Sequence, residues 1–395
     1  MSGSFSIQPI GRFSGDSQAV KRPKILVQLH SLFTKLTVQE IACFSYDDKH
    51  EFHLGDSSLK WYYPPRLGAD LSEGFESFDK HDDSADEHLD SLLKTIIAHE
   101  QEEGKKIDAQ VVTWRGMITK DCIFIEENHA YKQASKQKQQ QQQSKPRRWE
   151  NRGRDNQPPP PQFSPDVMTY WGYKFETLCT LPATWAETSR EYIESRDKEV
   201  VSNKAQYCSV VRTGLGKTIL CIGGEVDAAT TTDLPYAPAV WDAKPMQKGA
   251  PTNWIELKTS ASIRDDRGMA NFERKLMKFW IQSFLLGVPR IIVGFRSQAG
   301  VLEKLEEIKT EGIPATAAQR GVKSWNANMC INFGAGFLDW LRRTINDDGV
   351  WRIRRQPRSD TIEVFQIEEA GHGKILTDEF INWRIKLSLM NSEGG

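Results

Sequence analysis

The chain has 395 residues, and its 52 basic and 53 acidic side chains give a formal net charge of −1 at pH 7. This balance excludes a strong overall attraction to nucleic acid, so any such binding must depend on local patches. Twelve tryptophans and an aromatic fraction of 10% are typical of a folded globular protein and exclude a largely disordered chain. No run approaches the roughly 18 apolar residues that span a bilayer, and we expect no membrane partner.

The six cysteines are scattered without a CxxC pair, and no apolar signal segment stands at the N-terminus. This pattern predicts reduced, mostly buried thiols in an intracellular protein. Residues 1–20 are rich in serine and glycine, which predicts a flexible N-terminal arm. We expect a single large domain over residues 21–395.

The first part of that domain contains three informative segments. Residues 60–63, Lys-Trp-Tyr-Tyr, predict either a strand end packed on the core or a basic surface for stacking nucleotides; the packed strand end is the more common arrangement. Leucines and isoleucines recur at helical spacing between residues 87 and 99 and predict an amphipathic helix. Residues 111–116 predict a strand that runs into a glycine turn. Arg115, beside Trp114 at its end, is either a phosphate ligand or an ordinary surface arginine.

Residues 131–162 interrupt the pattern with a run of five glutamines, a basic cluster and a run of four prolines. This composition cannot bury a core, so we predict a disordered, basic insertion in a loop. Its charge suits non-specific contact with RNA phosphates or a nuclear-import patch. A tolerated insertion without function explains the composition equally well.

The segment 207–222 predicts a β-hairpin rather than a nucleotide-binding loop. Its turn ends in Gly-Lys-Thr, which invites comparison with a P-loop. A P-loop requires a further glycine five residues before Gly216 and a helix after the turn. Position 211 is valine, and β-branched and apolar residues follow the turn, so we predict two strands.

The other predicted elements complete an α+β fold, in which a central mixed β-sheet core is flanked by helices. The aromatic stretch 168–176 does not distinguish helix from strand. The remaining elements are a long helix over 265–286, a strand buried on both faces over 290–295, a helix over 333–345, a strand pair over 351–354 and 362–365, and a short helix near 380–385.

The densest pattern of ionisable residues lies between positions 223 and 258. Glu225 and Asp227 are separated by one valine, and Glu256 and Lys258 are separated by one leucine. If both stretches are strands, the period of two places each charged pair on one face. Pairing of the two strands would bring three carboxylates and an ammonium together.

Such a group predicts metal-dependent hydrolysis of a phosphodiester or pyrophosphate. Hard Mg²⁺ or Mn²⁺ prefers carboxylate ligands, and two ions about 4 Å apart can activate water and stabilise the leaving oxygen. None of the eight histidines lies between residues 168 and 292, which argues against a zinc site there. Asp227 followed by Glu256-Leu257-Lys258 matches the core of the PD-(D/E)XK nuclease pattern.

The chain also resembles the DXO/RAI family of RNA 5′-end decapping nucleases, a divergent branch of the PD-(D/E)XK fold. The similarity extends from about residue 44 to the C-terminus, and the insertion falls between the first and second motifs. Five motifs occur in the family's order: Trp114-Arg115-Gly116, Trp171 to Glu176, Gly224 to Asp227, Glu256 to Lys258, and Lys278 to Arg290.

The resemblance implies a metal-binding role for most of the carboxylates. Glu176, Asp227 and Glu256 would bind the divalent ions, Mg²⁺ or Mn²⁺ and two in number, with the backbone of Leu257 as a further ligand. Glu225 would act through water bound to the metal.

It implies roles for four further residues. Lys258 would orient or activate the attacking water, and Gln282 would bind substrate or water from a neighbouring helix. Arg115 would hold a substrate phosphate, and Trp114 beside it would contact RNA.

The family's activity implies a pyrophosphohydrolase that converts 5′-triphosphate RNA to 5′-monophosphate RNA, and that removes unmethylated or NAD-type caps. Some members also degrade RNA from 5′ to 3′. The fungal nuclear branch binds a nuclear 5′→3′ exoribonuclease, and the glutamine-rich insertion favours that branch and a nuclear location.

Two other classes of function remain open on the sequence. The first is a non-catalytic protein that only stabilises the exoribonuclease, and the second is a PD-(D/E)XK nuclease that acts on DNA. The complete set of carboxylates with the lysine counts against the first, and the ordered motifs count against the second.

Overall fold

The computed structural model describes residues 38–82, 88–113, 123–126, 163–230, 253–322, 324–345, 349–356, 359, 361–368 and 373–393, together with the backbone of 11–14. Most of the predicted arm, the whole predicted insertion at 131–162, and both Trp114 and Arg115 lie outside the described residues. The predicted domain boundaries therefore stay predictions.

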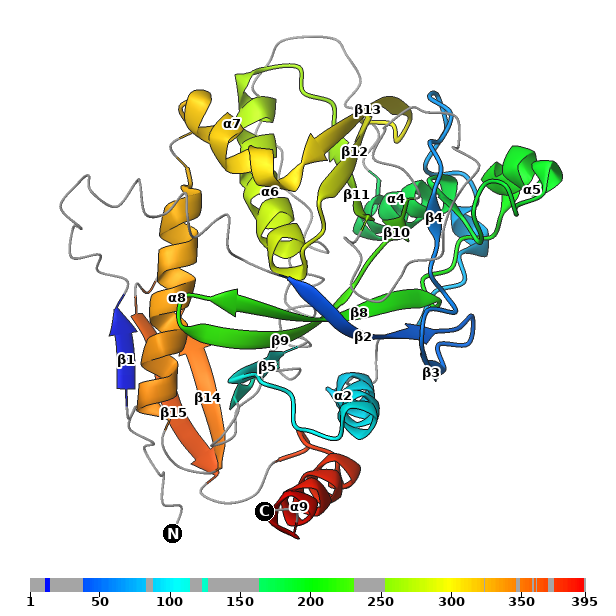
Figure 1. The fold of residues 1–395 in the computed structure, drawn as a ribbon. Coiled ribbons are helices and arrows are strands. Elements are labelled where there is room, and N and C mark those ends of the chain that lie inside the picture. The colour runs from blue at the N-terminus through cyan, green and yellow to red at the C-terminus, as the bar shows by residue number, and fades with distance from the viewer. Residues whose placement is uncertain are drawn as a thin grey trace, which may run out of the picture.

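The strands in these ranges form two mixed sheets of six strands and one antiparallel sheet of three (Figure 1). The first sheet contains, in spatial order, β3 (Phe52–Leu54), β2 (Gln39–Tyr46), β8 (Gln206–Leu215), β9 (Thr218–Glu225), β5 (Val111–Thr113) and β6 (Ile123–Phe124). The second contains β13 (Leu302–Lys309), β12 (Arg290–Arg296), β11 (Trp254–Ala261), β10 (Ala228–Ala229), β4 (Trp61–Tyr62) and β7 (Thr180–Leu181). The third contains β1 (Gly11–Ser14), β15 (Thr361–Glu368) and β14 (Val350–Arg355).

Helices cover both large sheets. The described residues form the α-helices α2 (Asp90–Glu103), α4 (Pro165–Leu178), α5 (Arg190–Ser195), α6 (Asp266–Leu286), α7 (Ile313–Gln319), α8 (Ala327–Thr344) and α9 (Asp378–Glu393), with short 3₁₀ turns at Phe75–Ser77, Arg196–Lys198 and Thr310–Gly312. None of the helices in the described ranges combines the length and apolar character that crossing a membrane requires.

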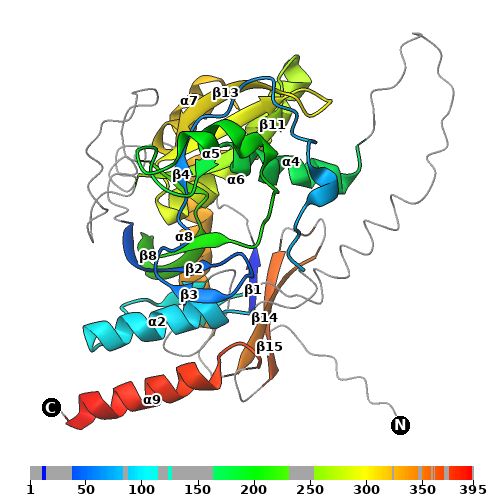
Figure 2. The same cartoon turned by 90° about the vertical axis from the view of Figure 1, so that its right-hand side faces the viewer.

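The first sheet is covered by α2 and α9 on one face and by α6 and α8 on the other (Figures 1 and 2). The second sheet packs against α4 on one face and against α6 and α7 on the other. Helix α6 therefore contacts both sheets, including β9, which ends at Glu225, and β11, which carries Glu256 and Lys258.

Strand β12 shows how one strand serves two cores. Ile291 and Val293 pack in the cluster with α6, whereas Ile292, between them, packs in the cluster with α4. Such alternation follows from the two-residue period of a strand. The prediction that this strand is buried on both faces is confirmed.

Two glycines let helices approach the sheets closely. A Cβ atom on Gly224 of β9 would lie 2.4 Å from Cδ1 of Leu286 on α6. One on Gly294 of β12 would lie 2.5 Å from Cε2 of Phe175 on α4. Both contacts are shorter than van der Waals packing allows, so larger residues would push these helices or their side chains away. Gly224 directly precedes Glu225. Phe175, the residue that contacts Gly294, directly precedes Glu176. Both close approaches therefore lie beside predicted site residues.

Most predicted elements are confirmed, including the α+β fold, the hairpin of β8 and β9 and the late pair of β14 and β15. The undecided stretch 168–176 is helical and lies within α4. Two predicted helices are longer than expected. The helix predicted at 333–345 begins at Ala327, and the short helix predicted near 380–385 extends from Asp378 to Glu393.

A buried carboxylate joins the C-terminal helix α9 to α2. Glu100 is 0% exposed. Its Oε1 accepts the backbone N–H of Ile107 at 2.9 Å and forms an ion pair with Arg384 at 2.9 Å. Its Oε2 accepts the indole N–H of Trp383 at 2.8 Å. These partners compensate for removing the carboxylate from water, and two of them are supplied by α9.

Candidate active site

The predicted charged residues lie where the chain passes from the first sheet to the second. Strand β9 ends at Glu225, and the chain continues through Val226 and Asp227 into β10. There Ala228 pairs with Ile255 of β11, one residue before Glu256. The expectation of one strand carrying Glu225 and Asp227 on the same face is therefore wrong in detail, because the strand ends between them as the chain changes sheets.

Direct contacts nevertheless join the two stretches. The Oδ2 atom of Asp227 accepts the backbone N–H of Leu257 at 2.6 Å. The Nζ atom of Lys258 forms an ion pair with Glu256 and lies 4.0 Å from Oδ2 of Asp227. Asp227, Glu256 and Lys258 thus form one cluster, as the sequence predicted.

Glu176 joins this cluster from helix α4. Burial raises the pKa of Glu176 well above its ordinary value, and the negative charges of Asp227 and Glu225 raise it further. The positive charges of Lys258 and Lys60 act in the opposite direction. Phe175, the residue before Glu176, packs in one core cluster with Ile255 and Leu257 on either side of Glu256, so α4 lies against the strand that carries Glu256.

The other carboxylates experience the same environment. Burial, followed by the charge of Asp227, raises the pKa of Glu225 to about 7 and that of Glu256 to about 7, while Lys258 opposes both shifts. Burial alone would lower the pKa of Lys258, but Asp227 and Glu256 hold it above its ordinary value. Glu225 keeps solvent-exposed surface although protein surrounds its carboxylate. The site is therefore an acidic, partly desolvated cluster that small solutes can reach from the side of Glu225.

The donor set of this cluster fits a hard divalent cation. Lys258, which pairs with Glu256, balances only part of the negative charge of the four carboxylates of Glu176, Glu225, Asp227 and Glu256. Oxygen ligands of this kind are the ones that Mg²⁺, Mn²⁺ and Ca²⁺ prefer. A bound cation would relieve the mutual repulsion that raises the carboxylate pKa values.

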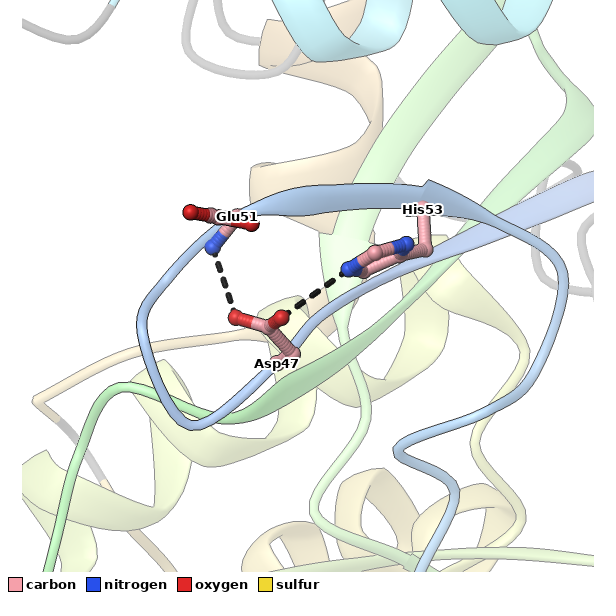
Figure 3. Close-up of side chains that lie close together, drawn as sticks. All are labelled: Asp47, Glu51 and His53. Atoms are coloured by element: carbon pink, nitrogen blue, oxygen red, sulfur yellow. Dashed lines mark hydrogen bonds and ion pairs between the residues drawn. The ribbon is translucent and has the colours of Figure 1, made fainter.

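Among the described residues, the group of three possible metal ligands whose atoms already lie close together is found not in this cluster but in the turn between β2 and β3. One oxygen or nitrogen of each of Asp47, Glu51 and His53 lies within 4.8 Å of the others (Figure 3). Asp47 Oδ1 accepts the backbone N–H groups of Glu51 and Lys49, each at 2.9 Å, and Oδ2 contacts His53 Nε2 at 3.0 Å. The bonds from Glu51 and then His53 lower the pKa of Asp47 to about 2. The Asp47 carboxylate thus stabilises the turn, and we assign it no metal.

Gln282, predicted to contact substrate, is exposed on α6 and forms no hydrogen bond with the described residues. It lies one helical turn before Leu286, which packs on Gly224. Residues four apart share a helix face, so Gln282 is on the side of α6 that faces the end of β9. Trp114 and Arg115 lie outside the described residues, and their predicted roles stay predictions.

Lys60 lies near the site, although its sequence context predicted only a packed strand end or a basic stacking surface. Trp61 and Tyr62 form β4 and are half-buried, which supports the interpretation of a packed strand end over a nucleotide-stacking surface. The charge of Lys60, immediately before them, opposes the rise in the pKa values of Glu176 and Glu225. A lysine before a short strand does not by itself indicate that Glu176 and Glu225, more than 100 residues later in the chain, lie near it.

The sequence profile described as RAI1 like PD-(D/E)XK nuclease matches residues 37–381. A decapping nuclease RAI1 from Gibberella zeae is 57% identical, over 98% of each chain. The decapping nuclease din1 of Schizosaccharomyces pombe is 32% identical, over 78% of this chain and 87% of its own.

Solved structures show the same architecture. The crystal structure of Candida albicans Rai1 in complex with pU5-Mn²⁺ has a TM-score of 0.75 and 28% identity, and covers 89% of this chain and 95% of its own. Scheffersomyces stipitis Rai1 in complex with (3′-NADP)⁺ and calcium ion has a TM-score of 0.75 and 26% identity, and covers 89% of this chain and 97% of its own.

Proposed function

This chain belongs to the RAI1-like family of PD-(D/E)XK nucleases, whose named relatives are decapping nucleases, and we propose that it is a metal-dependent hydrolase of RNA 5′ ends. The reactions we propose are the conversion of 5′-triphosphate RNA to 5′-monophosphate RNA with release of pyrophosphate, and the removal of unmethylated and NAD-type caps. The observation that carries the proposal is the convergence of four carboxylates and Lys258 from two sheets and α4. Related proteins bound to pU5-Mn²⁺ and to (3′-NADP)⁺ with calcium support it.

We propose a separate role for each residue of the site. Glu176, Asp227 and Glu256 would hold divalent cations, which supply charge neutralisation at the scissile phosphate when bound. Lys258 remains an ammonium at neutral pH, since its pKa is raised. It therefore acts as a hydrogen-bond donor that orients the attacking water and not as the base. Glu225 is reachable by solvent, and its proposed role is to hold that water by a second hydrogen bond.

The cellular setting is also a proposal. By resemblance to the fungal branch of the family, we propose a nuclear location and association with a 5′→3′ exoribonuclease that consumes the 5′-monophosphate RNA. A purely stabilising role in that association would not need an intact acidic cluster. The presence of every predicted carboxylate and of Lys258 in one cluster favours catalysis.

The test is direct. The protein is incubated with 5′-triphosphate RNA, unmethylated-capped RNA, NAD-capped RNA and duplex DNA in Mn²⁺ or Mg²⁺, beside the double variant Glu176→Ala/Asp227→Ala. We expect pyrophosphate or cap release from RNA by the wild type and none by the variant. Inactivity on every RNA would overturn the proposal, and cleavage of DNA alone would favour a DNA nuclease. Equal activity of the variant would show that the site is assigned to the wrong residues.

Metal binding should depend on pH. Without metal, Glu225 and Glu256 have pKa values of about 7 in the folded protein, against an ordinary value of 4.5. The folded state thus binds more protons at these two groups than the unfolded state does between these values. Their contribution to stability is therefore greatest below about pH 4.5 and falls as the pH rises towards 7. A divalent cation at 100 times its Kd contributes about 2.7 kcal/mol. We expect Mn²⁺ to raise the Tm more at pH 7.5 than at pH 5, where protons compete with it.

Differential scanning fluorimetry in Mn²⁺ and in EDTA measures this difference. An equal Tm gain at both pH values would contradict it, as would an undiminished gain in Asp227→Asn.

A further inference from the structure

Lys60 is held beside the acidic cluster by the backbone of the second sheet. Its carbonyl oxygen accepts the N–H of Ala229 at 2.8 Å, and the next residue, Trp61, pairs with Ala229 in the parallel bridge between β4 and β10. Ala229 lies two residues after Asp227. The register of this bridge therefore fixes Lys60 next to the segment in which the chain crosses between the sheets.

Neighbouring side chains indicate the face on which Lys60 lies. Leu59 and Trp61 pack in the core cluster that contains Trp254. Tyr62 packs in the other cluster, with the aromatic residues of α4. Side chains alternate along extended backbone, so Lys60 shares the side of Tyr62. That side faces α4, the helix that carries Glu176.

The charge of Lys60 reaches the site without being neutralised there. Burial raises the pKa values of Glu176 and Glu225, and the charge of Lys60 opposes these rises less strongly than that of Lys258 does. Within the described ranges Lys60 forms no ion pair. Lys258, by contrast, is paired with Glu256. Lys60 is also half-buried, which limits the positions that its ammonium can take. The cluster thus has one lysine committed to a carboxylate and a second one available to an external anion.

We propose that Lys60 binds a phosphate of the RNA substrate adjacent to the scissile phosphate, an inference that rests on the proposed function. A site with four carboxylates repels a polyanion wherever cations do not cover it. Lys60 provides positive charge on the α4 side of the cluster. It comes from the segment before β4, whereas Lys258 lies on β11. An ammonium is a compact point charge suited to a phosphate oxygen.

The aromatic neighbours of Lys60 do not share this role. Trp61 and Tyr62 belong to the two core clusters, and Tyr63 lies against the guanidinium of Arg196, 4.6 Å from the ring centre. Within this segment, the packed aromatics hold the backbone in place, and the lysine supplies the contact with substrate.

The experiment measures binding, which does not depend on turnover. Fluorescent pentauridylate with a 5′-phosphate, and the same RNA with a 5′-hydroxyl, are titrated with the full-length protein in Ca²⁺ at several salt concentrations. The variants are Lys60→Met, which keeps the length of the side chain, Lys60→Arg, which keeps its charge, and Lys217→Met as the matched control. Lys217 is exposed in the hairpin turn at the opposite end of β9 from Glu225.

We expect Lys60→Met to raise the Kd about tenfold and to reduce the slope of log affinity against log salt by about 0.7, the value for one phosphate contact on single-stranded RNA. Lys60→Arg should restore most of the affinity, Lys217→Met should match the wild type, and the Tm of each variant should be unchanged. A loss confined to the 5′-phosphorylated RNA identifies the terminal phosphate, and a loss with both RNAs identifies an internal one.

Two failures are distinguishable. If the wild type binds RNA and Lys60→Met has the same Kd and salt slope, the inference about Lys60 is overturned while the proposed function stands. If the wild type binds neither RNA, the proposed function fails and the inference fails with it.

Discussion

Asp227→Asn is expected to reduce the hydrolysis of 5′-triphosphate RNA by at least about 1000-fold while the protein stays folded. A metal-binding carboxylate at the centre of the site supports several kcal/mol of transition-state stabilisation, and each 1.36 kcal/mol changes a rate tenfold. Asp227 has that central position because it contacts Lys258 and raises the pKa values of Glu176, Glu225 and Glu256. The measurement is pyrophosphate release under saturating Mn²⁺.

Asparagine is the informative replacement at this position. Its side-chain oxygen can still accept the N–H of Leu257, which Asp227 accepts at 2.6 Å. Alanine would leave that N–H unpaired at a cost of about 1–3 kcal/mol, which would mix a folding defect with a catalytic one. Asp47→Asn in the β2–β3 turn is the control, because it removes the same charge from the alternative cluster. An active Asp227→Asn beside an inactive Asp47→Asn would move the metal site to that turn.

Glu100→Ala is expected to lower the free energy of unfolding by about 3–5 kcal/mol, the range measured when one partner of a buried ion pair is removed. The change removes the ion-pair partner of Arg384 and leaves the indole N–H of Trp383 and the N–H of Ile107 without this acceptor. Equilibrium urea unfolding gives the value from the midpoint at constant slope.

Two companion variants test the cause of this loss. Glu100→Gln keeps one oxygen acceptor and should be destabilised less than Glu100→Ala. Asp339→Ala removes one partner of the exposed pair with Arg343 on α8, 2.8 Å apart, and should change stability by less than about 1 kcal/mol. A Glu100→Ala effect as small as that of Asp339→Ala would show that α9 is held mainly by apolar packing.

The elements that the sequence predicts well are those whose side chains follow a single period. The strand at 290–295 is apolar after Arg290. The helix at 265–286 has an apolar face and an Asp265 N-cap whose side chain accepts the N–H of Gly268. Local pattern and tertiary environment agree in both.

The stretch that contains Glu176 is ambiguous because two periods coexist. Aromatic residues at 171, 173 and 175 alternate as in a strand, whereas the residues buried in the structure, at 170, 171, 174, 175 and 178, follow a helix. The deciding signal precedes the stretch. Ser164 caps the helix by accepting the N–H of Val167, and proline occupies the first helical position, which is the usual beginning of a helix.

The site itself was predictable only where its residues are close in the sequence or belong to a recognisable motif. The two-residue spacing of Glu256 and Lys258 predicts that their side chains share a face of the strand. The predicted cluster of these two residues with Asp227 is confirmed. Glu225 ends β9, whereas Asp227 lies in the connection to β10. The position of this break depends on where the chain changes sheets, which no local pattern encodes. Lys60 is more than 160 residues from Glu225, and only the bridge between β4 and β10 brings it near.

The crossing at Val226 also bears on how the protein loses activity. Glu225 belongs to one sheet and Glu256 to the other, and the short segment between β9 and β10 joins the two sheets. Partial unfolding of either sheet would separate the carboxylates before the whole molecule unfolds. Activity should therefore decline no later than the hydrogen-exchange protection of whichever sheet opens first, and neither sheet isolated as a fragment would retain a working site.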